Sequence, residues 1–151
     1  MTKYNRFFLV DDDADDVSIF KHVLQQVNPS IDFISAGDGQ EALRFLKDQQ
    51  SDFPDVIFLD LNMPRMSGKE CLTELKKDED LQNIPVIMYT TSSQSKDIEE
   101  TMQKGAICFI TKPSDLNELK NILHSISQNV HGNLARCLRT LSDTSNTFIV
   151  C

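Results

Sequence analysis

The chain has 151 residues, of which 40% are hydrophobic and 25% are charged, and its formal net charge is −8. This length fits one domain, and this composition excludes a disordered or collagen-like chain. The negative charge argues against binding to nucleic acid, because proteins that contact the phosphate backbone present a basic face. No apolar run approaches the roughly 20 residues that cross a bilayer, which argues against a membrane protein.

The four cysteines, Cys71, Cys108, Cys137 and Cys151, neither form a C-x-x-C pair nor have the spacing of metal ligands. Residues 1–6 do not resemble the start of a secretory signal peptide. We therefore expect reduced thiols and a cytoplasmic location, since disulfides are rare in that compartment.

Short β-branched or aromatic runs alternate along the chain with stretches in which apolar residues recur three and four positions apart. The short runs predict five strands, at Tyr4–Val10, Ile31–Ala36, Asp55–Asp60, Ile84–Tyr89 and Ala106–Ile110. The periodic stretches predict a helix after each strand, over about residues 17–27, 38–46, 67–75, 98–102 and 114–126. Five such strand–helix units predict a doubly wound α/β sandwich with right-handed crossovers.

Several residues mark the ends of these elements. Asp38 and Glu41 have the spacing of a capping box, and Ser67 and Ser114 are placed to cap the helices that follow them. The run Val56–Leu59 is apolar throughout, as in a parallel strand that is buried on both faces. These signals favour a parallel sheet with helices on both sides.

Residues 129–151 follow the last strand–helix unit and form a C-terminal extension to a domain of residues 1–128. Five apolar residues with the spacing of one helical face predict a helix over residues 130–142; they are Val130, Leu134, Cys137, Leu138 and Leu141. This helix either packs on its own domain or contacts another subunit. The apolar stretch Thr147–Val150 is either a short strand or a frayed end, and we expect no second domain after it.

Polar side chains follow the ends of four predicted strands. They are Asp11, Asp12 and Asp13 after the first, Asp60 after the third, Thr90 after the fourth and Lys112 after the fifth. Ligands of an open parallel sheet bind outside the carboxyl ends of its strands. Carboxylates gathered there repel one another, so the site needs a cation. Oxygen ligands without Cys or His favour Mg²⁺ or Mn²⁺.

Four parts of the sequence resemble the receiver domain of two-component response regulators. They are Phe8–Asp13, Asp60–Gly68, Val86–Thr91, and Gly105–Ala106 with Ile110–Pro113, in the order and at the spacing of that family. The resemblance covers about residues 5–127. It implies a CheY-like, flavodoxin-like fold, with a parallel sheet of five strands in the order 2-1-3-4-5 and helices on both faces.

The resemblance also implies which residues handle a phosphoryl group. Asp60 would accept it, Lys112 would pair with Asp60 or with the phosphoryl oxygens, and Thr90 would donate a hydrogen bond to it. Phe109 would be the aromatic switch residue, which in this family moves between exposed and buried positions.

A metal site follows from the same resemblance. Asp12, Asp60 and the backbone carbonyl of Asn62 would bind Mg²⁺ directly, or Mn²⁺ in its place, while Asp11 would act mostly through a water. Asp13 remains an alternative ligand if the first strand ends one residue later.

These features indicate a response regulator that accepts phosphate from a sensor histidine kinase or a histidine phosphotransfer protein, and not an enzyme with external turnover. Output would be by contact with a downstream protein, through the surface of the fourth helix, fifth strand and fifth helix. That surface or the C-terminal extension could also join two copies of the chain. The alternative is a receiver-like scaffold that is never phosphorylated and acts only by binding proteins.

Overall fold

A sheet of six strands, in the order β2-β1-β3-β4-β5-β6, forms the centre of the computed structural model, which describes residues 5–48 and 52–151. The strands are β1 (Arg6–Val10), β2 (Asp32–Ala36), β3 (Val56–Leu59), β4 (Val86–Thr90), β5 (Cys108–Thr111) and β6 (Ile149–Val150). The helices are α1 (Ala14–Val27), α2 (Gly39–Leu46), α3 (Gly68–Lys77), α4 (Ser95–Gln103), α5 (Leu116–Asn129) and α6 (Leu134–Thr144). Strands β1 to β5 are parallel, as predicted. Tyr4, expected to start the first strand, lies outside the described residues.

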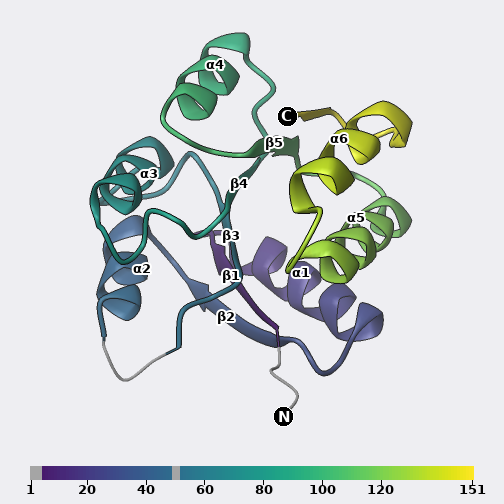
Figure 1. Ribbon diagram of the computed structural model, residues 1–151, viewed down its shortest axis with the longest axis horizontal. Helices are drawn as coiled ribbons and strands as arrows, with labels where there is room; N and C mark the ends of the chain where they lie inside the picture. The colour runs from purple at the N-terminus through teal and green to yellow at the C-terminus, as the bar shows by residue number, and fades with distance from the viewer. Residues whose placement is uncertain (1–4, 49–51) are drawn as a thin grey trace.

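Helices cover both faces of the sheet, with α1, α5 and α6 on one side and α2, α3 and α4 on the other (Figure 1). Because successive side chains of a strand point to opposite faces, β1 sends Phe7 and Leu9 into the core under α1 and α5. It sends Phe8 and Val10 into the core under α2 and α3. All of β3 is buried, as its apolar run predicts. No helix in the described part of the chain is both long and apolar enough to cross a membrane.

Side-chain caps begin four of the helices that follow strands, namely α1, α2, α3 and α5. Ser67 and Glu70 form a complete capping box at the start of α3. Asp38 caps α2, where its Oδ1 accepts a hydrogen bond from the Glu41 N–H at 2.9 Å. The prediction of a complete capping box is wrong here. The Glu41 carboxylate accepts a hydrogen bond from the N–H of Gly37, at 3.0 Å, and not from the N–H of Asp38.

The helix α5 is capped one residue later than predicted. Its cap is Asp115, whose Oδ1 accepts a hydrogen bond from the Asn117 N–H at 2.8 Å, and Ser114 precedes it. A charged carboxylate is a stronger acceptor than a hydroxyl, which favours Asp115 over its neighbour.

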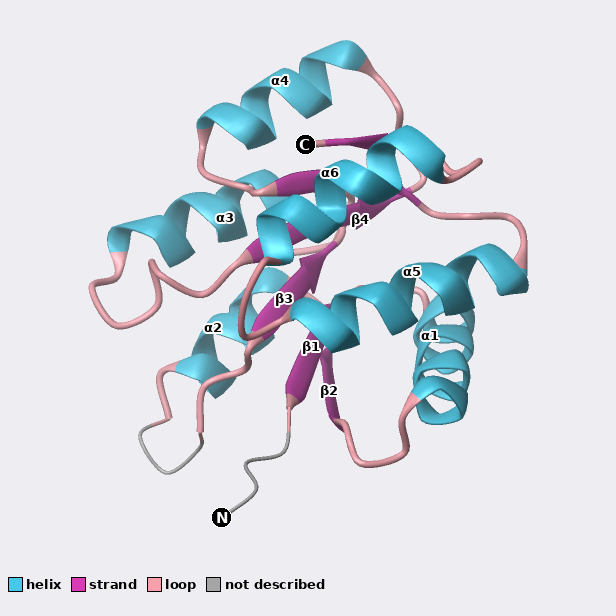
Figure 2. Ribbon diagram, turned by 45° about the vertical axis from the view of Figure 1, so that its right-hand side comes forward, coloured by secondary structure: helices cyan, strands magenta, loops and turns pink. Residues whose placement is uncertain are grey.

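The sheet has one strand more than the five predicted. β6 pairs with β5 in the antiparallel direction, with Ile149 opposite Ile110 and Val150 opposite Phe109. Figure 2 shows this last strand in magenta beside the C-terminus. A strand of two residues is too short for hydrophobic periodicity to identify. Of the two alternatives for the end of the extension, the strand is the one observed.

The helix predicted over residues 130–142 is α6, which begins at Leu134. Asn133 adopts a left-handed conformation with a φ of 64° and separates α6 from α5, so Val130 belongs to the end of α5. α6 packs on α5 and buries Leu134, Leu138 and Leu141, which is the alternative in which the extension packs on its own domain.

A disulfide joins Cys108 in β5 to Cys151, which directly follows β6. The prediction of reduced thiols is therefore wrong for this pair, because the fold brings together two cysteines that are 43 residues apart. Cys71 and Cys137 are free thiols.

Candidate functional site

Asp11 and Asp60 lie next to each other at the carboxyl edge of the sheet. Val10 and Leu59 are partners in the parallel pairing of β1 with β3, and the two aspartates are the next residues along the chain. The Asp60 N–H donates to the Val10 carbonyl at 3.0 Å, which maintains this register. Both aspartates are buried, at 2% exposure for Asp11 and 7% for Asp60. Two neighbouring buried carboxylates repel each other and require positive charge close by.

Asp12 completes a group of three carboxylates. One ligand oxygen from each of Asp11, Asp12 and Asp60 lies within 4.8 Å of the other two. Asp12 is exposed, so this group opens to solvent on one side. Asp13 has a different role, since it caps α1 and its Oδ1 accepts from two backbone N–H groups of the first helical turn, at 3.0 and 3.2 Å. We refer to Asp11, Asp12 and Asp60 as the acidic group.

Lys112 reaches the acidic group from the end of β5. Its ammonium nitrogen lies 2.7 Å from Asp11 Oδ2, 2.7 Å from Asp16 Oδ2 and 3.7 Å from Asp60 Oδ2. The same nitrogen lies 5.8 Å from the centroid of the Tyr89 ring, within the range of a cation–π contact. The family resemblance pairs Lys112 with Asp60, but in this structure its nearest partners are Asp11 and Asp16.

Asp16 is a site residue that the sequence pattern does not single out. It lies in the first turn of α1, and its Oδ2 is as close to Lys112 as that of Asp11. Acidic residues are common in first turns because they stabilise the helix N-terminus, so its charge alone indicates no partner. The signal that could have found it is its position just beyond β1, at the edge of the sheet where Lys112 was also expected.

Burial and ion pairing shift the pKa values of these groups. Burial raises the pKa of Asp11, although its contacts with Lys112 and with the backbone of Asp13 oppose the shift. Burial alone would lower the pKa of Lys112, but close contacts with the Asp11 and Asp16 carboxylates and the charge of Asp60 hold that pKa above its usual range. Lys112 therefore stays an ammonium at neutral pH.

The loop between Asp60 and α3, which contains Asn62, packs closely on the end of β3. The Gly68 N–H donates to the Leu61 carbonyl at 2.8 Å. A Cβ atom placed on Gly68 would overlap the backbone carbonyl oxygen of Asp60. Only glycine therefore allows α3 to approach the acidic group this closely.

An ion pair connects the same loop to the start of α2. Arg65, which has a φ of 63°, contacts Asp38 Oδ2 through Nε at 2.8 Å and through Nη2 at 2.6 Å. Hydrogen bonds from the Glu41 N–H and from Arg65 hold the pKa of the buried Asp38 carboxyl below its usual value. This contact anchors the loop that contains Asn62.

Residues 7–124 match a known protein family, the response regulator receiver domain. The chain belongs to this family. The resemblance of the four sequence segments to receiver domains is thereby confirmed.

Two relatives of this receiver domain are bacterial proteins. Response regulator Rcp1 of Synechocystis sp. is 34% identical over 122 residues, which are 78% of this chain and 83% of Rcp1. Chemotaxis protein CheY-3 of Vibrio cholerae is 34% identical over 116 residues, which are 75% of this chain and 87% of CheY-3. Both relatives are aligned over most of their length, so the similarity extends through most of the receiver fold.

Solved structures show the same architecture. The phosphorylated cyanobacterial phytochrome response regulator RcpA has a TM-score of 0.76 and 32% identity, covering 83% of this chain and 93% of RcpA. The Mn²⁺-bound form of Rcp1 has a TM-score of 0.73 and 32% identity, covering 82% of this chain and 92% of Rcp1. The expected flavodoxin-like fold is confirmed, with β6 added to the five predicted strands.

The acidic group of this receiver domain fits a divalent cation. Among the described residues, Asp11 Oδ2 is buried without a hydrogen-bond donor of regular geometry, and it depends on the nearby charge of Lys112. The acidic group and Asp16 together carry more negative charge than the single positive charge of Lys112 can balance. Carboxylate oxygens without Cys or His are suitable ligands for Mg²⁺ or Mn²⁺.

Both predicted switch residues of the receiver domain are fully buried. Thr90 ends β4, and Phe109 packs in the core under α3 and α4. The loop after β4 is tied to β5, because the Thr111 hydroxyl donates to the Ser92 carbonyl at 2.9 Å. This hydrogen bond links the loop to the strand that carries Phe109.

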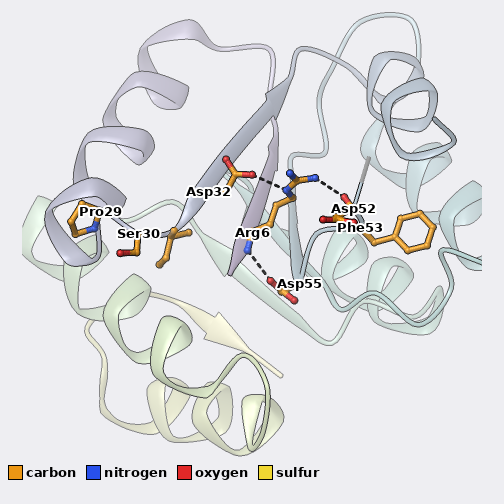
Figure 3. A pocket seen from close by; sticks show the side chains of 8 residues that line it. Arg6, Pro29, Ser30, Asp32, Asp52, Phe53 and Asp55 are labelled. Atoms are coloured by element: carbon orange, nitrogen blue, oxygen red, sulfur yellow. Dashed lines mark hydrogen bonds and ion pairs between the residues drawn. The ribbon is translucent and has the colours of Figure 1, made fainter. Parts of the chain in front are cut away.

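A hollow of about 570 Å³ lies at the opposite end of the sheet, beyond the first residues of β1 and β2 (Figure 3). Arg6 crosses it, donating through Nε to Asp32 at 2.8 Å, through Nη1 to the Asp52 carbonyl at 2.6 Å and through its N–H to Asp55 at 2.7 Å. Phe53 also lines this hollow. Its carboxylates Asp32 and Asp55 accept hydrogen bonds from Arg6, and Asp52 also lines it.

Proposed function

We propose that this receiver domain accepts a phosphoryl group on Asp60 from a phosphohistidine of a sensor histidine kinase or a histidine phosphotransfer protein. The observation that carries the proposal is the convergence of the acidic group and Lys112 at the end of β3. In the transfer, the P–N bond of the donor breaks as a P–O bond to the Asp60 carboxylate forms. Its loose transition state requires in-line positioning and neutralisation of charge.

The residues that would hold Mg²⁺, or Mn²⁺ in its place, are Asp12, Asp60 and Asn62 through its backbone carbonyl, with Asp11 acting mostly through a water. The bound ion would neutralise negative charge on the phosphoryl oxygens. Lys112 supplies a second positive charge, with its ammonium nitrogen 3.7 Å from Asp60 Oδ2. Its permanently charged ammonium can contact a phosphoryl group attached there.

Phosphorylation would then change the surface formed by α4, β5 and α5. The product brings extra negative charge and three acceptor oxygens. The Thr90 hydroxyl would donate to one of them, and Phe109, which is already buried, would repack beside β5. This is a two-state element whose populations are shifted by a covalent modification.

The signal would be read by a downstream protein in the cytoplasm, without turnover of an external substrate. Two copies could associate through the α4–β5–α5 surface or through residues 129–151. The chain thus acts as a phosphoacceptor signalling protein, and its own chemistry is limited to phosphoryl transfer onto Asp60 and hydrolysis of the product.

Labelling with a small phosphodonor tests this proposal. The protein is incubated with acetyl phosphate, with and without Mg²⁺, and its intact mass is measured. We expect one phosphoryl group on the wild type in Mg²⁺ and none on Asp60→Asn. Asp13→Asn is the matched control, because asparagine is also a good helix cap and Asp13 lies outside the acidic group. No labelling would favour the scaffold that acts only by binding, and equal labelling of wild type and Asp60→Asn would contradict Asp60 as the acceptor.

A further inference from the structure

A disulfide fastens the last strand of the sheet beside Phe109. Cys108 is fully buried in β5, whereas Cys151 is exposed to solvent. The two cysteines directly adjoin Phe109 and Val150, which face each other across the β5–β6 pair. The covalent bond is therefore located at the strand that contains the predicted aromatic switch.

β6 is a short strand, and its hydrogen bonds are limited. The Thr111 N–H donates to the Phe148 carbonyl at 3.0 Å, and on the other side of the strand the Ser142 hydroxyl donates to the Ile149 carbonyl at 2.8 Å. Its pairing with β5 extends over two residues, which is below the usual length of a strand. The burial of Ile149 also holds β6 in place, and the disulfide adds a covalent link between Cys151 and β5.

In the proposed cytoplasmic location, a redox role is expected for this disulfide, because cytosolic disulfides are uncommon and usually transient or redox-sensing. We propose that Cys108 and Cys151 form a redox site that reacts with dithiol reductants, and that its reduction releases β6 from the edge of β5. The cytoplasmic location used in this argument is part of the proposed function. The redox step itself does not require phosphorylation.

The exchange would begin at the exposed sulfur. A thiolate of the reductant attacks Cys151 Sγ, the S–S bond breaks, and Cys108 leaves as a thiolate that takes up a proton. The second thiol of the reductant then attacks the mixed disulfide, and Cys151 leaves and is protonated. The protein gains two electrons and two protons, and the dithiol is oxidised to its own disulfide.

Reduction would alter both the edge of β5 and its connection to the acidic group. Thr111 is the link, because its N–H donates toward β6 while its hydroxyl donates to the Ser92 carbonyl in the loop after β4. Loss of β6 leaves the Thr111 N–H without this acceptor and removes Val150 from its place opposite Phe109. A strand edge with free backbone groups can pair with another extended segment. The oxidised chain keeps this edge covered, and the reduced chain opens it.

Hydrogen exchange of the full chain, followed by NMR, tests the inference without use of phosphorylation. The protein is equilibrated with oxidised or reduced dithiothreitol, and free thiols are counted by alkylation after unfolding. Cys71 and Cys137 alone should react in the oxidised form, and all four cysteines in the reduced form. The Thr111 amide should exchange at least about tenfold faster after reduction. The Asp60 amide, which donates to Val10, should keep its rate.

Two serine variants separate this pair from the other thiols. Cys151→Ser changes an exposed side chain, so it should fold, and in oxidising buffer its Thr111 amide should exchange as in the reduced wild type. Cys137→Ser, in α6, should retain the full redox response. Four free thiols in oxidised dithiothreitol, or equal exchange at Thr111 in both redox states, would overturn the proposal. Failure of phosphodonor labelling would leave this result unaffected.

Discussion

The ammonium of Lys112 lies 2.7 Å from the buried Oδ2 of Asp11, whereas 3.7 Å separate it from Asp60. In this state the lysine neutralises the carboxylate next to the proposed acceptor, and the acceptor itself has no contact as short with it. A cation bound to the acidic group would share Asp11 with Lys112. Either the lysine or the cation can therefore neutralise Asp11, whereas at Asp60 the lysine makes only the longer contact of 3.7 Å.

Replacement of Lys112 by methionine should destabilise the metal-free protein by about 3 kcal/mol, because it leaves the buried charge of Asp11 without its neutralising cation. Mg²⁺ should restore part of this loss, since it supplies the missing positive charge and stabilises the folded state by mass action. Urea unfolding in EDTA and then in Mg²⁺ measures both effects. Lys120→Met, at an exposed position of α5, is the control and should change the unfolding free energy by less than about 0.5 kcal/mol. Equal stability of the two variants would contradict the role given to Lys112.

The ion pair between Asp38 and Arg65 should make stability depend on acid pH. The folded-state pKa of Asp38 is lower than its ordinary value of 3.8, so its contribution is complete well above that pH and is lost as the pH falls through the folded-state pKa. Asp38→Asn keeps a capping side chain but removes the charge. Because Arg65 is largely exposed, we expect the variant to be less stable by only about 0.5–1 kcal/mol at pH 7.

Thermal unfolding of both proteins between neutral and strongly acid pH checks this expectation. The difference between wild type and Asp38→Asn should shrink below pH 3.8, where the wild-type carboxyl takes up its proton. A difference that stays constant over the whole range would show that the charge of Asp38 is not responsible.

Gly68→Ala should push α3 away from the end of β3, because the added methyl group overlaps the Asp60 carbonyl. We expect a loss of about 1–3 kcal/mol in stability and weaker binding of Mg²⁺, measured by urea unfolding and calorimetric titration. Gly132→Ala is the control, since a Cβ atom there meets nothing within 4 Å. Unchanged Mg²⁺ affinity in Gly68→Ala would mean that this close approach does not shape the acidic group.

Leu138→Ala tests whether α6 belongs to the core of the domain. Leu138 is fully buried against the helices on its side of the sheet, so its truncation should cost about 2–5 kcal/mol. Leu116→Ala, at a side chain that is 58% exposed, should cost less than about 0.5 kcal/mol. Denaturant unfolding compares the two. A small effect at Leu138 would indicate that α6 is only loosely attached.

Local pattern was sufficient to predict the parallel sheet, because each strand–helix unit carries its own periodicity and its own turn. The continuous apolar run of β3 even predicts burial on both faces. The acids and Lys112 at the strand ends could be predicted for the same reason, since parallel strands end at one edge of the sheet. Family resemblance then assigned roles that spacing alone does not provide.

Other features depend on contacts between distant parts of the chain, which local pattern does not contain. Asp16 and Lys112 are 96 residues apart, and Arg65 meets Asp38 across 27 residues. β6 is too short to have a period, and the disulfide of Cys108 exists only because β6 pairs with β5. Each of these contacts requires the folded sheet before it can be recognised.

Reduction with borohydride most directly tests whether Asp60 captures the phosphoryl group, because it converts an aspartyl phosphate into homoserine at the modified position. The protein is treated with acetyl phosphate and Mg²⁺, reduced, digested and sequenced by mass spectrometry. We expect homoserine at position 60 in Mg²⁺, none when EDTA replaces it, and unmodified aspartate at positions 11 and 12. Homoserine at either of those two positions, or none at position 60 under any condition, would contradict the proposed chemistry of this receiver domain.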